Sequence, residues 1–534
     1  MKNKHFLAIL VITAAILFIP GLGKMDLTDP DESFYAQTAR EMLEEGDWLT
    51  PRIFDEPQFE KPPLYYWLVI GSYKAFGVNE FAARFPSALF AMIGVIGVFY
   101  LAKLFYGEIA GFFSGLVTAT CVQYMALARA CVTDMALTVF ILLCLVFFMY
   151  GWVSEKKRFF YLSSVMAGLA VLTKGPIGLF IPGMTVLLYV AFTRQWKHFS
   201  RVPFPLCAFF LLAVSLPWYV LVTRAHGQAF IGEFFGLHNI TRFTTPEHRI
   251  GSSPFFYIPI VLGGFLPWTL FIPAAISDMR KKGGESIDGI KGKGAFLLIW
   301  FLVVFVFFSI SKTKLVTYIF PLFPAMAVVM GRFWSRLDLR TVYEDYRLNL
   351  EIAYSVLIAA GVGGAIAGPM IFAHEFPGLG ITPWILAAEA MFLAGIVLSF
   401  ALFLQDKVQR AGLAIALSVA LAGTVVVVAV LPGMNDYVSS RTLSEKYIEL
   451  ASPGEPLGGE CDHRRGIAFY SGKREVVDVH PYHDLKMYMS RPDRVWAIIQ
   501  VKHYKQLAED DGAKKPIILV QEAGEYVLIT NKAL

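Results

Sequence analysis

Charged residues stand in this chain between long apolar stretches that point to a membrane. From Ile109 to Ser154 the charged residues are Arg129 and Asp134 alone. Either charge would cost about 2.5–3.5 kcal/mol at the centre of a bilayer. Because two membrane spans must fit into these 46 residues, we expect both charges to lie in the turn that joins the spans.

Lysines occupy two further turns of the same kind. Lys174 lies in a Thr-Lys-Gly-Pro turn, and Lys312 and Lys314 lie in a Ser-Lys-Thr-Lys turn with Tyr318 one helical turn later. Each lysine could instead be an interfacial anchor that extends its ammonium toward the head groups. Their placement on one face of the membrane favours a shared site.

The loop that follows the first apolar stretch adds carboxylates. It carries Asp31, Glu32, Glu60 and Lys61, and a second long loop adds Arg242. A topology in which all these turns and loops lie on one side of the membrane brings them to the same face. The separate segments therefore predict one polar site.

Carboxylates beside several fixed cations suit the transfer of a sugar from a lipid-linked phosphate. Lys and Arg neutralise the leaving phosphate, and a carboxylate can act as an acid, a base or an orienting group for the nucleophile. A donor held on a polyprenyl chain would bind at the membrane face. An anion transporter could use the same residue types, although its charges would lie at mid-membrane.

Each of these residues also has a local interpretation. Asp29 could cap the helix that follows it, with Glu32 as its capping-box partner. Asp31 would then only favour the helix dipole. Asp134 could likewise cap a span, and Arg129 could bind the phosphates of lipid head groups.

The composition requires a membrane around most of the chain. Of the 534 residues, 56% are hydrophobic and 17% are charged, whereas soluble domains have about 45–50% and about 25%. Residues 435–534 hold 29 of the 89 Asp, Glu, Lys and Arg residues. We therefore predict a polytopic membrane domain over 1–434 and a small α/β domain over 435–534. The net charge of +5 gives no indication of a nucleic-acid partner.

A membrane-spanning helix needs about 20 apolar residues. Such windows predict about 13 spans, near 5–23, 81–102, 109–127, 133–152, 159–173, 176–193, 203–223, 255–276, 294–311, 315–333, 350–372, 381–404 and 411–431. The first follows Lys2 and Lys4 without a clear cleavage site, so we interpret it as an uncleaved anchor. With the N-terminus inside, cytoplasmic segments hold 20 Lys and Arg residues, and the outer loops beyond the first hold seven. This bias predicts a cytoplasmic N-terminus and an extracytoplasmic C-terminal domain.

Local patterns predict elements that could position the site. The two largest outer loops are 24–80 and 224–254, and the first should hold a helix that begins near Pro30 and ends before Gly46. The C-terminal domain should contain a helix near 440–451. Its β-rich runs are 475–479, 495–501, 517–520 and 526–530.

Motifs that run in order from residue 1 to about residue 330 resemble those of one family. They are Asp-Glu-Ser-Phe-Tyr-Ala at 31–36, Arg-Glu-Met-Leu at 40–43, Gly-Asp-Trp at 46–48, Phe-Glu-Lys-Pro at 59–62, Thr-Lys-Gly at 173–175, Ile-Thr-Arg-Phe at 240–243, Leu-Pro-Trp at 266–268 and Phe-Phe-Ser-Ile-Ser-Lys-Thr-Lys-Leu-Val-Thr-Tyr-Ile at 307–319. Through them the chain resembles the bacterial undecaprenyl-phosphate aminoarabinose (4-amino-4-deoxy-L-arabinose) transferases. These enzymes modify lipid A and belong, with the protein O-mannosyltransferases, to the GT-C glycosyltransferases.

The resemblance implies a role for each residue of the site. Asp31 would act at the acceptor, and Asp134 would support the same centre. The residues that would contact the donor phosphate are Lys61, Lys174 and Arg242. Those at the carrier-lipid groove would be Lys312, Lys314 and Tyr318, and the supporting residues would be Glu32, Glu60 and Arg129.

Two positions depart from the family pattern. The family commonly has Arg where this chain has Phe34, which removes a cation from the acceptor side. It also has His directly before Ile-x-Arg-Phe, where this chain has Asn239, with His238 one residue earlier. A divalent metal bridged by Glu60 and that histidine is therefore not expected, and we predict that no metal or other cofactor is required.

The sequence thus predicts a multi-pass α-helical glycosyltransferase of the GT-C class in the bacterial inner membrane. It would move a sugar from an undecaprenyl phosphate carrier to an extracytoplasmic acceptor by a single inverting displacement, and the resemblance implies lipid A as that acceptor. One alternative is transfer to protein Ser or Thr, which would require Asp31 as a general base. The other is a transporter of lipid-linked saccharides.

Overall fold

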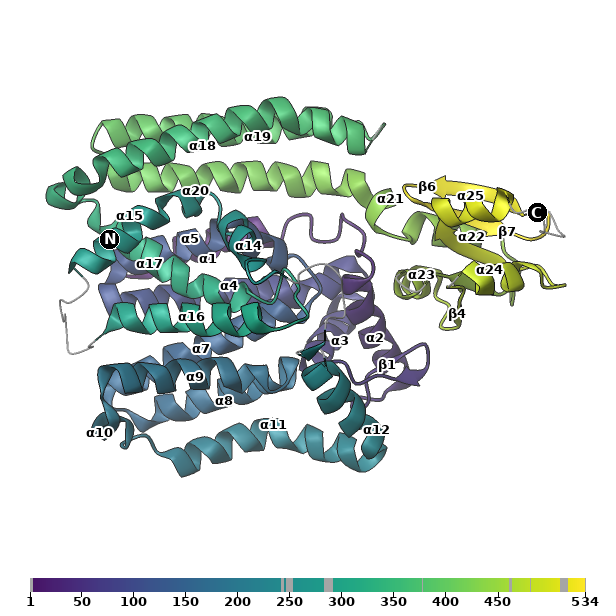
Figure 1. Ribbon diagram of the computed structural model, residues 1–534, viewed down its shortest axis with the longest axis horizontal. Coiled ribbons are helices and arrows are strands. Elements are labelled where there is room, and N and C mark those ends of the chain that lie inside the picture. The colour runs from purple at the N-terminus through teal and green to yellow at the C-terminus, as the bar shows by residue number, and fades with distance from the viewer. Residues whose placement is uncertain are drawn as a thin grey trace.

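Long helices lying side by side form most of the protein (Figure 1). The computed structural model describes residues 3–241, 244–245, 253–282, 292–376, 378–460, 463–480, 482–509 and 517–533. The main helices are α1 (Asn3–Phe18), α4 (Glu80–Tyr106), α5 (Glu108–Thr120), α6 (Val122–Ala128), α7 (Thr133–Ser154), α8 (Lys157–Lys174), α9 (Ile177–Thr193), α11 (Phe204–His226), α14 (Tyr257–Gly264), α15 (Ile272–Lys282), α16 (Lys293–Ile310), α17 (Phe323–Arg336), α18 (Arg340–Glu375), α19 (Thr382–Leu404) and α20 (Val408–Val425). Shorter helical segments between them are α10 (Trp196–Phe199), η2 (Trp268–Phe271), η3 (Phe320–Leu322), η4 (Val426–Val430) and η5 (Leu431–Met434).

The apolar character of these helices makes the chain an integral membrane protein. Among the described residues, seven helices are long and apolar enough to cross a bilayer. Two bent pairs, α5 with α6 at 67° and α14 with the helix after it at 101°, raise the number to as many as nine. Lys4–Phe18 and Ile177–Thr193 are shorter apolar helices. The count of 13 spans therefore stays a prediction.

The first loop (24–80) folds at one end of the helical bundle. Its elements are α2 (Asp31–Glu45), β1 (Arg52–Ile53), β2 (Glu56–Pro57) and α3 (Leu64–Phe76). The limits of α2 confirm the predicted helix, and Gly46 ends it in the left-handed conformation, at φ 71°, that glycine adopts most readily. The second loop (224–254) contributes α12 (Gln228–Phe230) and the π-helix η1 (Ile231–Thr241).

The C-terminal region (435–534) contains a five-stranded sheet. Its helices are α21 (Asn435–Val438), α22 (Arg441–Leu450), α23 (Arg464–Ser471), α24 (Tyr482–Met489) and α25 (Val501–Glu509). Its strands are β3 (Leu457–Gly459), β4 (Val476–Asp478), β5 (Trp496–Gln500), β6 (Ile518–Ala523) and β7 (Tyr526–Thr530). The strand order is β4-β3-β5-β7-β6, with the first three parallel and β7 antiparallel to both its neighbours. The four predicted strands are confirmed, and β3 was not predicted because Leu457–Gly459 is short and glycine-rich.

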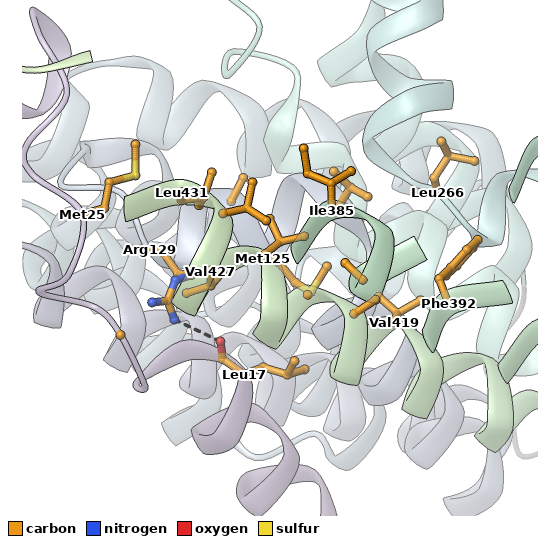
Figure 2. A pocket seen from close by; sticks show the side chains of 18 of the residues that line it. Leu17, Met25, Met125, Arg129, Leu266, Ile385, Phe392, Val419, Val427 and Leu431 are labelled. Carbon is orange, nitrogen blue, oxygen red and sulfur yellow. Dashed lines mark hydrogen bonds between the residues drawn. The ribbon is translucent and has the colours of Figure 1, made fainter. Parts of the chain in front are cut away.

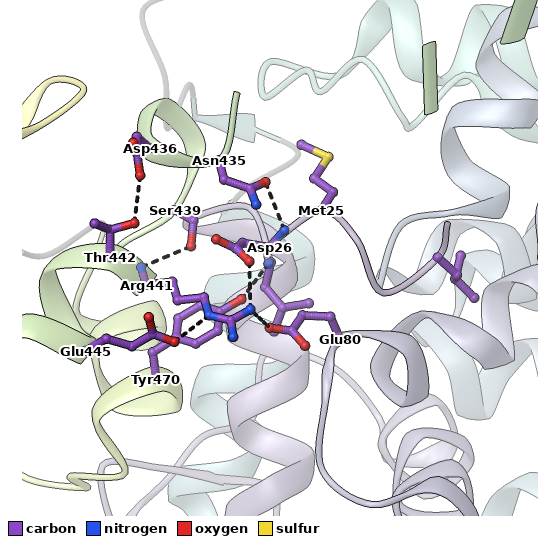
Figure 3. A network of polar contacts seen from close by, with 12 residues as sticks. Met25, Asp26, Glu80, Asn435, Asp436, Ser439, Arg441, Thr442, Glu445 and Tyr470 are labelled. Carbon is purple, nitrogen blue, oxygen red and sulfur yellow. Dashed lines mark hydrogen bonds and ion pairs between the residues drawn. The ribbon is translucent and has the colours of Figure 1, made fainter. Parts of the chain in front are cut away.

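Polar contacts fix the C-terminal region to the first loop (Figure 3). The guanidinium of Arg441 donates to carboxylate oxygens of Asp26 and Glu80, each at 3.0 Å. The backbone N–H of Leu27 donates to the Tyr470 hydroxyl at 2.7 Å. Because charged and neutral bonds from α22 and α23 reach both ends of the first loop, the C-terminal region has a defined position over that loop.

Asp29 belongs to the same contact and does not cap α2. Its Oδ2 accepts from the backbone N–H of Ser440 at 3.3 Å and from the Ser440 hydroxyl at 2.9 Å, and it lies 3.3 Å from Nδ1 of His463. Pro30 occupies the cap position and makes no side-chain cap bond. The local capping interpretation of Asp29 is therefore wrong.

Glu32 forms a buried ion pair beneath α2. Its two carboxylate oxygens accept from Nε and Nη2 of Arg84 at 2.8 and 2.6 Å. They also accept from the backbone N–H groups of Cys131 at 2.7 Å and Thr28 at 3.0 Å. A buried carboxylate with this many donors joins α2, α4 and the α6–α7 turn, so the start of α2 is held rigidly.

Candidate active site

Lys174 and Asp134 meet at the end of the bundle that carries the first loop. Asp134 lies in the first turn of α7, Lys174 is the last residue of α8, and the Lys174 ammonium is 2.7 Å from Asp134 Oδ1. The same ammonium lies 4.8 Å from the centroid of the Tyr318 ring. A carboxylate at a helix N-terminus and a cation at a helix C-terminus are each stabilised by the helix dipole. Asp134 thus pairs across the site and makes no cap bond with its own helix.

Asp31 opens onto the same site from the first turn of α2. Its side chain is exposed to solvent, unlike that of the neighbouring Glu32. Desolvation by the surrounding protein nevertheless raises the pKa of Asp31, the Asp134 and Glu60 carboxylates raise it further, and the Arg465 guanidinium opposes them. The structure therefore brings together the two predicted catalytic carboxylates, from α2 and α7.

The segment before α3 holds Glu60 and Lys61 close to these groups. The Lys61 ammonium lies 3.1 Å from a Glu60 carboxylate oxygen. The backbone N–H of Glu60 donates to Gln58 Oε1 at 3.0 Å. The backbone N–H of Phe59 donates at 3.0 Å to Glu233 of η1 in the second loop. Contacts from two loops therefore fix a segment that carries one cation and one carboxylate.

The turn between α16 and η3 carries the other predicted lysines. The Lys314 ammonium is buried and donates to the Ser311 carbonyl at 2.5 Å, whereas Lys312 is exposed. Burial lowers the pKa of Lys314, and the neighbouring Lys312 cation lowers it further. Tyr318 packs on Phe308, with ring centroids 5.4 Å apart.

Four residues that the sequence analysis discussed for the site lie elsewhere or outside the described residues. Arg242 falls in a segment that is not described, and so does the side chain of His238. Arg129 donates to the backbone carbonyls of Leu17, Phe18 and Pro20 at 2.7–3.2 Å and so fixes the end of α1. Glu32 is occupied by the buried pair with Arg84. Arg129 and Glu32 therefore support the architecture around the site.

An apolar cavity of about 760 Å³ is lined in part by Arg129 and Glu32. Figure 2 shows this cavity and the side chain of Arg129. Helices α1, α6, α18, α19 and α20 form most of its wall, with Leu17, Met125, Ile385 and Phe392 among the lining side chains. Polar lining comes from Thr28, Glu32, Arg84 and Arg129, and from Glu389 on α19.

Arg465 of α23 was missed by the sequence analysis. No motif marks the C-terminal region, so nothing in the sequence indicated that a residue there lies beside Asp31. The sequence analysis predicted that no metal is required. Within the described ranges, no group of three His, Cys, Asp or Glu side chains is arranged to hold a metal ion.

Solved structures define the class of the fold. ArnT from Cupriavidus metallidurans, solved bound to undecaprenyl phosphate, matches with a TM-score of 0.84 at 24% sequence identity. The match covers 100% of this chain and 99% of that one. With the charged site at the end of its membrane helices, the protein has the fold of the GT-C membrane glycosyltransferases.

Curated relatives narrow the class to a family. A family model described as dolichyl-phosphate-mannose-protein mannosyltransferase matches residues 60–220. The undecaprenyl phosphate-alpha-4-amino-4-deoxy-L-arabinose arabinosyl transferase of Edwardsiella ictaluri is 30% identical over 380 residues, which are 68% of this chain and 67% of that protein. The enzyme of the same name from Enterobacter sp. is 28% identical over 386 residues, which are 70% of this chain and 68% of that one. The chain belongs to the family of these arabinosyl transferases.

Proposed function

We propose that the protein transfers 4-amino-4-deoxy-L-arabinose from undecaprenyl phosphate to a phosphate of lipid A. The proposed donor, undecaprenyl phosphate-linked aminoarabinose, is the one in the names of the related arabinosyl transferases. The observation that carries the proposal is the Lys174–Asp134 pair beside Tyr318, with Asp31 open to solvent next to it. This arrangement offers cations to a leaving phosphate and carboxylates to the reacting sugar at the end of a membrane bundle.

The proposed placement in the membrane follows from the loop charges. The 13 spans would run through residues 1–434, with the N-terminus in the cytoplasm and residues 435–534 in the periplasm as a separate domain. The Lys and Arg bias of the loops supports this orientation. The N-terminus lies at the end of the bundle opposite the C-terminal sheet (Figure 1), which supports placing the two ends on opposite sides of the membrane.

The donor side of the site would consist of cations. Lys61, Lys174 and Arg242 would contact the carrier phosphate, and Lys312, Lys314 and Tyr318 would line the path of the carrier. Lys61 and Lys174 already stand in fixed positions beside carboxylates, so they need little reorganisation when charge develops on the leaving group. No step requires a metal.

The reaction would be a single displacement at the anomeric carbon. An acceptor phosphate oxygen forms a bond to C1 of the sugar while the bond from C1 to the carrier phosphate oxygen breaks, and the carrier phosphate keeps the electron pair. A phosphate monoester dianion becomes a diester, and the carrier leaves as a monoester, so total charge is conserved. Asp31 and Asp134 would stabilise positive charge on the sugar ring and orient the aminoarabinose.

The apolar cavity between α1, α6 and α18–α20 would receive a hydrocarbon chain of one of the two lipid substrates. Its lining is predominantly apolar and its helices belong to the membrane bundle. A cavity of that kind is stable when filled by hydrocarbon. Arg129, at the side next to the first loop, would provide positive charge close to an anionic head group, whereas the charge of Arg84 is balanced by Glu32.

A protein hydroxyl is the second candidate acceptor. The match of residues 60–220 to a mannosyltransferase family model favours it. A raised pKa would also suit Asp31 as the base that removes a hydroxyl proton.

Mass spectrometry of lipid A and of envelope proteins from a deletion strain separates the two acceptors. Loss of an aminoarabinose-bearing lipid A species that returns with the wild-type gene, and does not return with Asp31→Asn, is the expected result. Unchanged lipid A together with a missing sugar on proteins would establish the second candidate and contradict the first.

A further inference from the structure

Arg465 reaches from the C-terminal region into the candidate active site. Its guanidinium carbon lies 4.6 Å from the centroid of the Phe34 ring. Phe34 is one turn after Asp31 on α2 and therefore lies on the same face of that helix. The positive charge of Arg465 also acts on the exposed Asp31 and on the buried Tyr66 hydroxyl.

Other arginines of the C-terminal region are occupied by carboxylates. Arg464 binds Asp478 and the Val476 carbonyl, and Arg474 binds Glu44 and Asp55. Within the described part of the chain, by contrast, the guanidinium of Arg465 takes part in no hydrogen bond or ion pair. Its planar fork of N–H donors is therefore available to a ligand.

The backbone that carries Arg465 is fixed against the first loop. A Cβ atom on the next residue, Gly466, would lie 2.3 Å from the Asp29 carboxylate, so α23 and the start of α2 approach as closely as a glycine permits. Three residues further on, the Phe469 carbonyl accepts from Nη1 of Arg40 at 2.8 Å. Arg465 is thus held beside Asp31 by contacts on both sides of it.

The acceptor side of the site needs a cation of this kind. A phosphate monoester approaching Asp31 carries up to two negative charges, and it meets the additional carboxylates of Glu60 and Asp134. Two nearby lysines already contact those carboxylates, Lys61 with Glu60 and Lys174 with Asp134. Without a further cation, like-charge repulsion would oppose binding of the acceptor.

We propose that Arg465 binds the phosphate group of the acceptor, so that the C-terminal region completes the acceptor site. The inference rests on the proposed function, because it takes the acceptor to be a phosphate. The guanidinium forms paired, charge-assisted hydrogen bonds to phosphate oxygens while its other face stays on the Phe34 ring. Arg465 is thereby a specificity-determining residue for phosphorylated acceptors.

Separate kinetics for the two substrates test this role. Wild type, Arg465→Ala and Arg465→Lys are reconstituted in vesicles with lipid A and the undecaprenyl phosphate-linked sugar, each varied in turn. Arg465→Ala should raise the KM for lipid A by about tenfold to a hundredfold and leave the KM for the donor unchanged. Arg465→Lys should have a KM for lipid A between those of the wild type and Arg465→Ala, because lysine keeps the charge and lacks the planar guanidinium.

A second variant moves the cation to the neighbouring helix. Phe34→Arg combined with Arg465→Ala places a guanidinium on α2 beside the position that Arg465 leaves, and it should recover part of the affinity for lipid A. Arg464→Ala is the matched control on the same helix. It removes the contacts of Arg464 with Asp478, the Val476 carbonyl and the Phe54 ring of the first loop. The variant should lower the melting temperature without changing the KM for lipid A.

The outcomes separate the inference from the function on which it rests. An unchanged KM for lipid A in Arg465→Ala, or a rise confined to the donor KM, would overturn the role of Arg465 while wild-type transfer to lipid A stands. Wild-type enzyme that gives no transfer to phosphorylated lipid A would instead overturn the proposed function. If Arg465→Ala lost its fold, Arg465→Lys would still decide the question, because it keeps the charge and changes only the hydrogen-bonding geometry.

Discussion

The Lys174 ammonium lies 2.7 Å from the Asp134 carboxylate and joins the C-terminal end of α8 to the N-terminal end of α7. Both side chains are largely buried, at 13% and 8% exposed. The pair therefore keeps a cation and an anion in fixed positions at the end of the membrane bundle. Fixed charges of this kind stabilise a transition state without a cost of reorganisation when the reaction occurs.

Asp31→Asn should reduce transfer by at least about a hundredfold, because it removes the carboxylate that faces the reacting sugar. Activity in proteoliposomes and the melting temperature should be measured on the same preparation. Asp55→Asn is the control in the first loop, since this exposed carboxylate pairs with Arg474 at the surface and its loss should change activity little. A stable Asp31→Asn enzyme with near-normal activity would leave Asp31 with a structural role alone.

The pH dependence of transfer should report on Asp31. Desolvation and the carboxylates of Asp134, Glu60 and Glu32 raise its pKa, and the Arg465 guanidinium opposes the shift. If the ionised form is active, kcat/KM should increase with pH through a value above the usual range for aspartate, and activity should be lost as pH falls below it. Arg465→Ala should move that limb to still higher pH. A limb that moved to lower pH would show that another group controls the profile.

The three cations proposed to contact the donor phosphate should cause similar kinetic defects when they are removed. Lys61→Ala, Lys174→Ala and Arg242→Ala should each weaken use of the donor, because each removes a charge-assisted contact worth about 1.5–3 kcal/mol. Donor KM and kcat in vesicles are the measurements. Lys156→Ala, at the far end of α7, is the control for a lysine outside the site. Wild-type donor kinetics in all three variants would mean that the phosphate binds elsewhere.

The Glu32–Arg84 pair should determine stability. Arg84→Ala leaves a buried carboxylate without its bidentate partner, and loss of one member of a buried pair costs about 3–5 kcal/mol. The expected result is a marked fall in melting temperature in detergent, even with substrate present. Full thermal stability combined with complete loss of transfer would instead assign Glu32 to the chemistry.

The sequence predicted where α2, α7 and α8 begin and end better than it predicted which of their residues are in contact. The apolar pattern located α2 between Pro30 and Gly46, and it located Asp134 and Lys174 in turns between spans. Asp134 and Lys174 are 40 residues apart, and no periodicity shows which two turn residues will meet. The pairing depends on how α7 and α8 pack together.

The remaining features depend on contacts across even longer separations. Arg84 lay inside a predicted apolar span, where its partner Glu32, 52 residues away, could not be identified. Asp29 fitted a local cap, but it binds Ser440 instead, 411 residues further along the chain. The sequence showed that Phe34 replaces an arginine of the family on the acceptor side. It did not show that Arg465 lies over the Phe34 ring, because that contact depends on the packing of α23.

The membrane orientation predicts an accessibility pattern for single cysteines. In a background with the five native cysteines replaced, a cysteine at Ser253 or Ser471 should react with an impermeant thiol reagent in intact spheroplasts. A cysteine at Ser286 should react only after lysis, because Lys and Arg in short loops resist translocation. Labelling of residue 471 from the cytoplasmic side alone would reverse the orientation and separate the first loop from the periplasm.

Transfer by the purified protein tests the central claim most directly. The wild-type enzyme is reconstituted with undecaprenyl phosphate-linked aminoarabinose and lipid A, and the lipids are analysed by mass spectrometry. The account predicts lipid A that carries one aminoarabinose on a phosphate, released undecaprenyl phosphate in equal amount, and neither product with Asp31→Asn. Donor that remains intact in the presence of lipid A and active wild-type protein would contradict it.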